Sequence, residues 1–110
     1  MQKVDILGTE YEIMFMDNRM DPLLDEMDGY MDRSIKRIVI SNRPDNCEVI
    51  DWNVQQKNVL RHEIIHVYFE ESGLSVNVEN PAIGIPEMYV DWFALQSPKI
   101  YKTFRELELL

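Results

Sequence analysis

Residues 60–69 read LRHEIIHVYF, and this stretch decides how the 110-residue chain folds. Apolar residues occur on almost every side of a helix drawn through it, which is typical of a helix at the centre of a domain. Asn53 and Gln56 have the spacing of a capping box before it, and Gly73 lies where a helix would end. We therefore predict a buried helix of roughly nineteen residues, about 28 Å long, between Asn53 and Gly73.

Strand patterns precede this helix. Residues 4–6 and 11–15 alternate between apolar and polar on either side of Gly8-Thr9, which predicts a hairpin. Asp21-Pro22 predicts the start of a short helical turn. The clearest strand runs from Ile35 to Ile40, and it is either an edge strand beside the helix or a central core strand.

Helix patterns follow the buried helix. Residues 77–85 predict a connection, Pro86 opens a second helix, and Pro98 ends or bends it. A last amphipathic helix, from Ile100 to Leu109, would turn its apolar side inward. Because strands come first and helices after, we predict an α+β fold in one domain over residues 1–110. It would hold an antiparallel or mixed N-terminal sheet, the buried helix and two further helices.

Composition restricts the classes of protein. A chain with 45% hydrophobic and 28% charged residues is expected to be globular and not disordered. Eleven basic and twenty acidic residues give a net charge of −9, which argues against direct binding to nucleic acid or to an anionic membrane. The single Cys47 cannot form an internal disulfide, and no signal peptide or membrane-spanning segment is recognisable. We therefore expect a cytoplasmic protein.

His62, Glu63 and His66 form the pattern H-E-x-x-H on the predicted helix. Residues four apart lie on one face of a helix, so His62 and His66 can bind one Zn²⁺ together. Glu63 lies one step round the helix, where it can act as general base on zinc-bound water. Burying two histidines and a glutamate in an apolar helix is costly unless something binds them. The motif therefore predicts a zinc centre.

A catalytic zinc site needs a third protein ligand, and the chain has no third histidine. The candidates are Cys47 and several carboxylates. Glu70 and Glu71 continue the same helix, whereas Glu87 comes from a second element, in the first turn of the next predicted helix, and is the better ligand. A glutamate there would also suit the positive end of the helix dipole without any metal. Asp91 lies one turn after Glu87 and could accept a hydrogen bond from a ligand imidazole.

These residues resemble the ImmA/IrrE family of small zinc metallopeptidases. That family carries H-E-x-x-H on one helix, then a glutamate followed by an asparagine and a Phe-Ala pair. The matching residues here are Glu87, Asp91, Phe93 and Ala94. The likeness runs from Gly29 to Ala94 and implies a zincin-like domain with zinc at His62, His66 and Glu87. It also implies Glu63 as general base. Asp91 departs from the family's asparagine, so its contact is expected to be ionic or to reach the metal.

The resemblance implies a zinc-dependent enzyme that hydrolyses a peptide bond. Some members of the family act on repressors, so a basic DNA-binding regulator is the expected substrate, and a phage or mobile element is a fitting source. With zinc bound, the net charge would be about −7, which still attracts a basic protein. The alternative is a non-catalytic acidic binding module that occupies a DNA-binding protein as a decoy, with a vestigial or structural zinc site.

Overall fold

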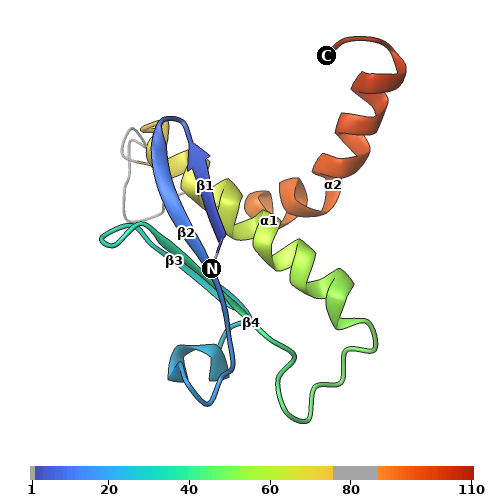
Figure 1. The fold of residues 1–110 in the computed structure, drawn as a ribbon. Helices are drawn as coiled ribbons and strands as arrows, with labels where there is room; N and C mark the ends of the chain where they lie inside the picture. Colours follow the sequence, from blue (N-terminus) through green and yellow to red (C-terminus); the bar gives the residue numbers. More distant parts are fainter. Residues whose placement is uncertain (1, 76–86) are drawn as a thin grey trace.

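The computed structural model describes residues 2–75 and 87–110 (Figure 1). A four-stranded sheet is followed by two helices, so the predicted α+β class is confirmed. The elements are strands β1 (Gln2–Ile6), β2 (Thr9–Met16), β3 (Gly29–Asp32) and β4 (Arg37–Ser41), the short 3₁₀ helix η1 (Pro22–Asp25), and helices α1 (Trp52–Glu71) and α2 (Glu87–Glu106). The connection expected over residues 77–85 and the helix-opening Pro86 lie outside the described residues.

The sheet is mixed and has the strand order β1-β2-β4-β3. β1 and β2 form the predicted hairpin, which turns at Leu7 and Gly8, both with positive φ. Turns of this kind match the twist of antiparallel strands. β4 pairs in parallel with β2 and antiparallel with β3. The strand predicted over Ile35–Ile40 is therefore central, and it begins at Arg37 because Ile35 lies exposed in the preceding turn.

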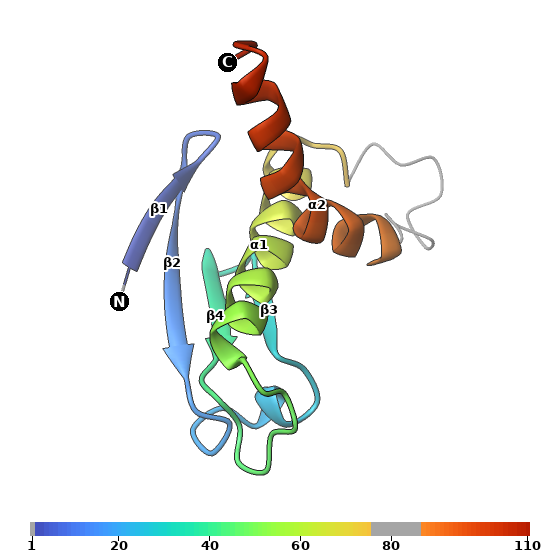
Figure 2. The same ribbon diagram turned by 90° about the vertical axis from the view of Figure 1, so that its right-hand side faces the viewer.

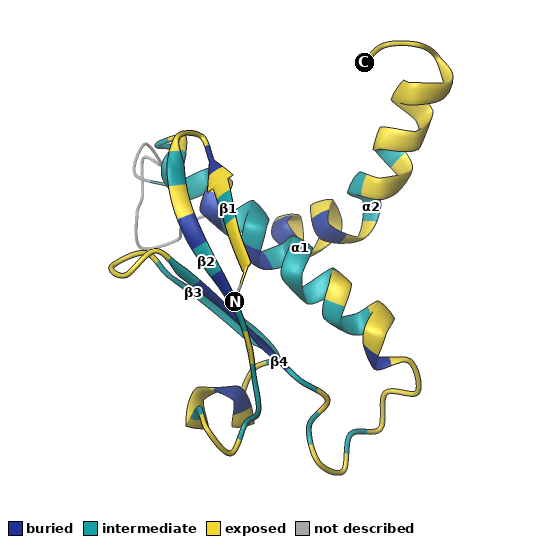
Figure 3. Cartoon of the chain, in the orientation of Figure 1, coloured by how far each residue is buried: buried dark blue, intermediate teal, exposed yellow. Residues whose placement is uncertain are grey.

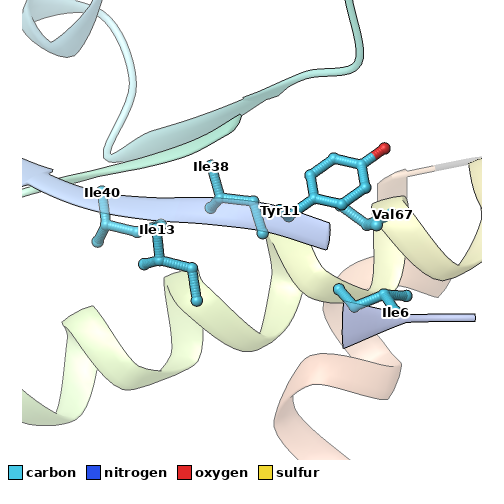
Figure 4. Close-up of a cluster of buried hydrophobic side chains, with 6 residues drawn as sticks. All are labelled: Ile6, Tyr11, Ile13, Ile38, Ile40 and Val67. Atoms are coloured by element: carbon cyan, nitrogen blue, oxygen red, sulfur yellow. The ribbon is translucent and has the colours of Figure 1, made fainter. Parts of the chain in front are cut away.

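The core lies between one face of the sheet and α1 (Figure 4). Its buried members are Ile6, Tyr11, Ile13, Ile38, Ile40 and Val67. The members from β2 and β4 are two residues apart because strand side chains alternate between the faces of a sheet. α1 packs against the sheet on one side and contacts α2 on another (Figures 1 and 2). The predicted helix is thus the central element, but it is not buried on every side: its buried residues are Trp52, Glu63 and Val67, and Tyr68 is 45% exposed.

α1 begins earlier than the predicted capping box. The Asp51 side chain caps it by accepting a hydrogen bond from the Val54 N–H at 3.2 Å, which leaves Asn53 inside the helix. Asp is as good a cap as Asn, and a start at Asp51 brings the buried Trp52 into the helix. Gln56 is used differently, since its amide donates to the Ser41 carbonyl oxygen at 3.0 Å and ties α1 to β4.

α2 is one continuous helix with Pro98 inside it, so the prediction of two further helices is wrong by one. Proline removes a single backbone hydrogen bond and can bend a helix without ending it, and Figure 2 shows the bend. Beyond Pro98 the helix projects away from the sheet and is mostly exposed (Figure 3). Phe104 and Leu107 are 44% and 63% exposed. The expected inward packing of this segment is therefore wrong. Neither α1 nor α2 is apolar enough over its length to cross a membrane.

Gly29 lies where β3 packs tightly against α1. A Cβ at this position would lie 2.8 Å from Val59 Cγ1 and 3.0 Å from the Val39 backbone oxygen. Contacts this short are repulsive, and a backbone oxygen in a central strand cannot move aside cheaply. Among the amino acids, only glycine therefore fits at position 29 without displacing α1 or the neighbouring strand β4.

The variant Gly29→Ala should lower the free energy of unfolding by about 1–3 kcal/mol, because it overpacks the helix–sheet contact. Urea unfolding followed by circular dichroism measures this loss. The double variant Gly29→Ala/Val59→Ala should lose less than the sum of the two single variants, because the truncation removes the nearest clashing atom. A Gly29→Ala protein as stable as the native chain would contradict the account.

Glu71 ties the end of α1 to the β1–β2 hairpin. Thr9 Oγ1 and Tyr11 Oη each donate a hydrogen bond of 2.8 Å to its carboxylate. Lys36 Nζ adds a contact at 3.5 Å. The bonds from Thr9 and Tyr11 lower the pKa of Glu71 below its ordinary value, and burial raises the pKa of Tyr11 to about 12. The carboxylate of Glu71 is thus held in its ionised form.

This lowered pKa predicts an acid-dependent stability. Because the pKa of Glu71 is lower in the folded than in the unfolded chain, its ionised form stabilises the fold above the unfolded-state pKa. That contribution should be lost as the pH falls below about 4.5. Glu71→Gln should lower the urea concentration at the unfolding midpoint at neutral pH. On acidification this midpoint should decrease less in the variant than in the wild-type chain. Glu70→Gln, which alters a surface pair with Arg33, is the matched control and should keep the wild-type pH dependence.

Candidate metal centre

Two histidines from α1 and one glutamate from α2 converge on one point. His62 and His66 lie one turn apart on α1, with ring centroids 4.9 Å apart. Glu87, at the start of α2, reaches both: its two carboxylate oxygens lie 2.9 Å from His62 Nε2 and 2.9 Å from His66 Nε2. One ligand atom from each residue lies within 4.8 Å of the other two.

This donor set fits a metal ion. In a tetrahedral site with bonds of about 2.0–2.1 Å, neighbouring ligand atoms are roughly 3.4 Å apart, which the observed separations allow. Two imidazole nitrogens and one carboxylate oxygen are ligands that divalent transition metals accept. Three protein ligands also leave a fourth position open. The group formed by His62, His66 and Glu87 can therefore hold a metal ion.

Asp91 contacts the opposite nitrogen of the first histidine. Its Oδ1 lies 2.7 Å from His62 Nδ1, while Glu87 faces Nε2 of the same ring. A carboxylate that accepts a hydrogen bond from Nδ1 fixes the tautomer in which Nε2 is free to bind a metal. The contact of Asp91 is therefore with the imidazole.

Glu63 lies beside the three residues without joining them. The residue is only 8% exposed, and it lines the same two hollows as His62. Burial, followed by the nearby charge of Glu87, raises the pKa of Glu63 to about 7, while His62 opposes the shift. A carboxylate with a pKa near 7 can both accept and donate a proton near neutral pH. Burial also lowers the pKa of His66, which favours its neutral, metal-binding form.

Two hollows meet at His62 and Glu63. The larger, of about 470 Å³, is lined on the β3 side by Met27, Gly29, Tyr30 and Met31, and further by His66 and Glu87. The smaller, of about 230 Å³, is mostly polar and is lined by Asp28, Gly29, Gln55, Asn58, Val59 and Asp91. Most of these lining residues were not expected from the sequence, because no motif marks them. Their position follows from the close approach of α1 to β3 at Gly29.

The other candidate ligands lie elsewhere. Glu70 pairs with Arg33, and Glu71 accepts hydrogen bonds from the hairpin, including one from Tyr11. Cys47 is a free, half-buried cysteine in the segment between β4 and α1. None of these three candidates belongs to the group around His62.

The contact of Asp91 with His62 predicts its effect on metal affinity. Asp91→Ala should weaken Zn²⁺ binding by about 10–100-fold, because the imidazole loses the acceptor that orients it. Asp91→Asn should lose less, since the amide oxygen can still accept the hydrogen bond. Competition with a chromophoric chelator measures both affinities. Asp45→Ala, which removes an exposed carboxylate paired with Arg19, is the control. Native affinity in Asp91→Ala would contradict the role.

Comparison of the chain with family models, with curated proteins and with solved structures finds no match. A function for this chain has to be argued from the chemistry of its own site. The part that the structure supports directly is a group of two histidines and one glutamate able to hold a metal ion.

Proposed function

We propose that this chain is a zinc-dependent metallopeptidase. The observation that carries the proposal is the arrangement of His62, His66 and Glu87 around one point, with the buried Glu63 beside them and outside the ligand group. Two histidines, one glutamate and an open position make up the ligand set of catalytic zinc in known peptidases, whereas structural zinc is usually enclosed by four protein ligands. The resemblance to the ImmA/IrrE family supports the same proposal.

The residues around the centre supply the proton transfers. Zinc, when bound, lowers the pKa of water and polarises a carbonyl. Glu63 accepts a proton from the attacking water as the water oxygen forms a bond with the carbonyl carbon. Glu63 then delivers that proton to the amine nitrogen as the C–N bond breaks, and so returns to its starting state. Asp91 keeps the His62 ring oriented throughout.

The substrate is proposed to bind along β3. β3 is one of the two edge strands of the sheet, and Gly29, Tyr30 and Met31 from it line the larger hollow together with Glu63. An extended peptide that adds to this edge gains main-chain hydrogen bonds and passes over the centre. The sequence left Ile35–Ile40 open as an edge strand or a central strand, and that segment supplies the central strand β4.

Charge favours a basic substrate. The chain carries a net charge of −9, and zinc would leave about −7. An acidic surface draws in basic proteins and repels nucleic acid. We therefore propose a basic DNA-binding regulator as the substrate and the cytoplasm as the place where the two meet.

Metal content and hydrolysis in three proteins test this proposal. The wild-type chain, His62→Ala and Glu63→Gln are purified without added zinc and assayed by elemental analysis and with a quenched fluorescent peptide library. We expect about one zinc per wild-type chain, none in His62→Ala, and a retained zinc in Glu63→Gln. Hydrolysis should fall by about 10²–10⁴-fold in Glu63→Gln, because only the general base is lost.

Glu70→Gln is the matched control, because it removes another α1 carboxylate that pairs at the surface with Arg33. It should keep both metal and activity. A wild-type chain that stays free of metal when zinc is supplied would overturn the proposal, and the acidic binding module would then be the better account. Equal activity of Glu63→Gln and wild type would also contradict it.

A further inference from the structure

Pro98 leaves one carbonyl of α2 without its usual donor. In an α-helix each carbonyl accepts a hydrogen bond from the N–H four residues later, and proline has no N–H. The carbonyl freed by Pro98 is that of Ala94. Ala94 is fully buried against the rest of the fold, so water cannot replace the missing donor cheaply. A side chain has to supply it.

Arg61 supplies that donor from α1. Its Nε donates to the Ala94 carbonyl oxygen at 2.6 Å. Its Nη2 also donates to Asn58 Oδ1 at 3.3 Å, one turn earlier on α1, which holds the guanidinium in place. Arg61 directly precedes the metal-group residue His62, and Ala94 lies on the same helix as Glu87 and Asp91. The bond thus joins the two helices that provide the residues of the centre.

The apolar contact of α2 is too small to fix its position by itself. Within the described part of α2, only Val90 and Ala94 are buried. Side chains of this size do little to prevent α2 from sliding or rotating against α1. A shift of α2 by one residue along its axis would move its side chains by about 1.5 Å. A metal site tolerates errors of about 0.2 Å in its ligand distances. The hydrogen bond from Arg61 to Ala94 adds a directional constraint between the helices, beside the contact of Asp91 with His62.

We propose that Arg61 is a positioning residue for the metal centre. By binding the carbonyl that Pro98 frees, it fixes α2 on α1 so that Glu87 reaches His62 and His66. The role rests on the proposed metal centre. It also makes Arg61 and Pro98 interdependent, because a residue with an N–H at position 98 would take the Ala94 carbonyl for the helix itself.

Co²⁺ titration of the 110-residue chain tests this role through the visible absorption bands of the bound ion. Arg61→Met should weaken Co²⁺ affinity by about tenfold or more and change the band intensities, because Glu87 is no longer held in place. Arg61→Lys should keep most of the affinity, since its ammonium can still donate to the carbonyl. Arg33→Met is the matched control: it removes a guanidinium that contacts α1 at Glu70, and it should bind like wild type.

The double variant separates positioning from general stability. In a Pro98→Ala background the Ala94 carbonyl has a backbone donor, so Arg61→Met should then weaken Co²⁺ binding by only about twofold. An equal loss in both backgrounds, or a folded Arg61→Met protein with native affinity and spectrum, would overturn the role. If Arg61→Met does not fold, Arg61→Gln and Arg61→Lys are compared in the same two backgrounds.

If the proposed metal centre does not exist, the same experiments give a different result from the one expected when only the role of Arg61 is wrong. A wild-type chain that binds neither Co²⁺ nor Zn²⁺ removes the metal centre. The four metal-free proteins (wild type, Arg61→Met, Pro98→Ala and the double variant) are unfolded in urea in either case. A smaller loss from Arg61→Met in the Pro98→Ala background supports the Arg61–Ala94 contact, and additive losses refute it.

Discussion

The burial of α1 between the sheet and α2 is the constraint on which the centre depends. Its inner side fills the core through Val67, and its approach to β3 is set by the missing side chain at Gly29. Because α1 is held on two sides, the face that carries His62 and His66 is kept beside α2, and their neighbour Glu63 is kept from water. Burial thus fixes the geometry of the site and also raises the pKa of Glu63 to about 7.

Local periodicity explains the parts of the structure that the sequence predicts. The alternation at Ile38 and Ile40 and the turn at Gly8 are short-range signals, and both give the expected strands and hairpin. The spacing of His62 and His66 is likewise a property of one helix, so the structure places both side chains on one face. The prediction of Glu87 as a ligand needed only one further assumption, that a second helix packs beside the first. In the structure its carboxylate oxygens lie 2.9 Å from the Nε2 atoms of both histidines.

Contacts between distant residues explain what the sequence could not show. Pro98 predicts an end or a bend of the helix, and the sequence does not show which, because Arg61, the donor that compensates for the missing N–H, precedes the accepting Ala94 by 33 residues. The polar hollow was unexpected for the same reason, since Asp28 and Asn58 meet only where β3 and α1 pack together. Phe104 has the spacing of a core residue, but the helix that carries it extends past the sheet.

The division of the ligands between two helices makes metal occupancy part of the stability of the fold. Among the described residues outside the metal group, α2 is held by the buried Val90 and Ala94, by the hydrogen bond from Arg61 and by the contact of Asp91 with His62. An ion shared by His62 and Glu87 would act as a cross-link between the helices, and by mass action its binding free energy would add to that of their association. The fraction of chains with α2 docked on α1 would then depend on the concentration of free metal. At low metal concentration, loss of the ion and separation of the two helices would occur together.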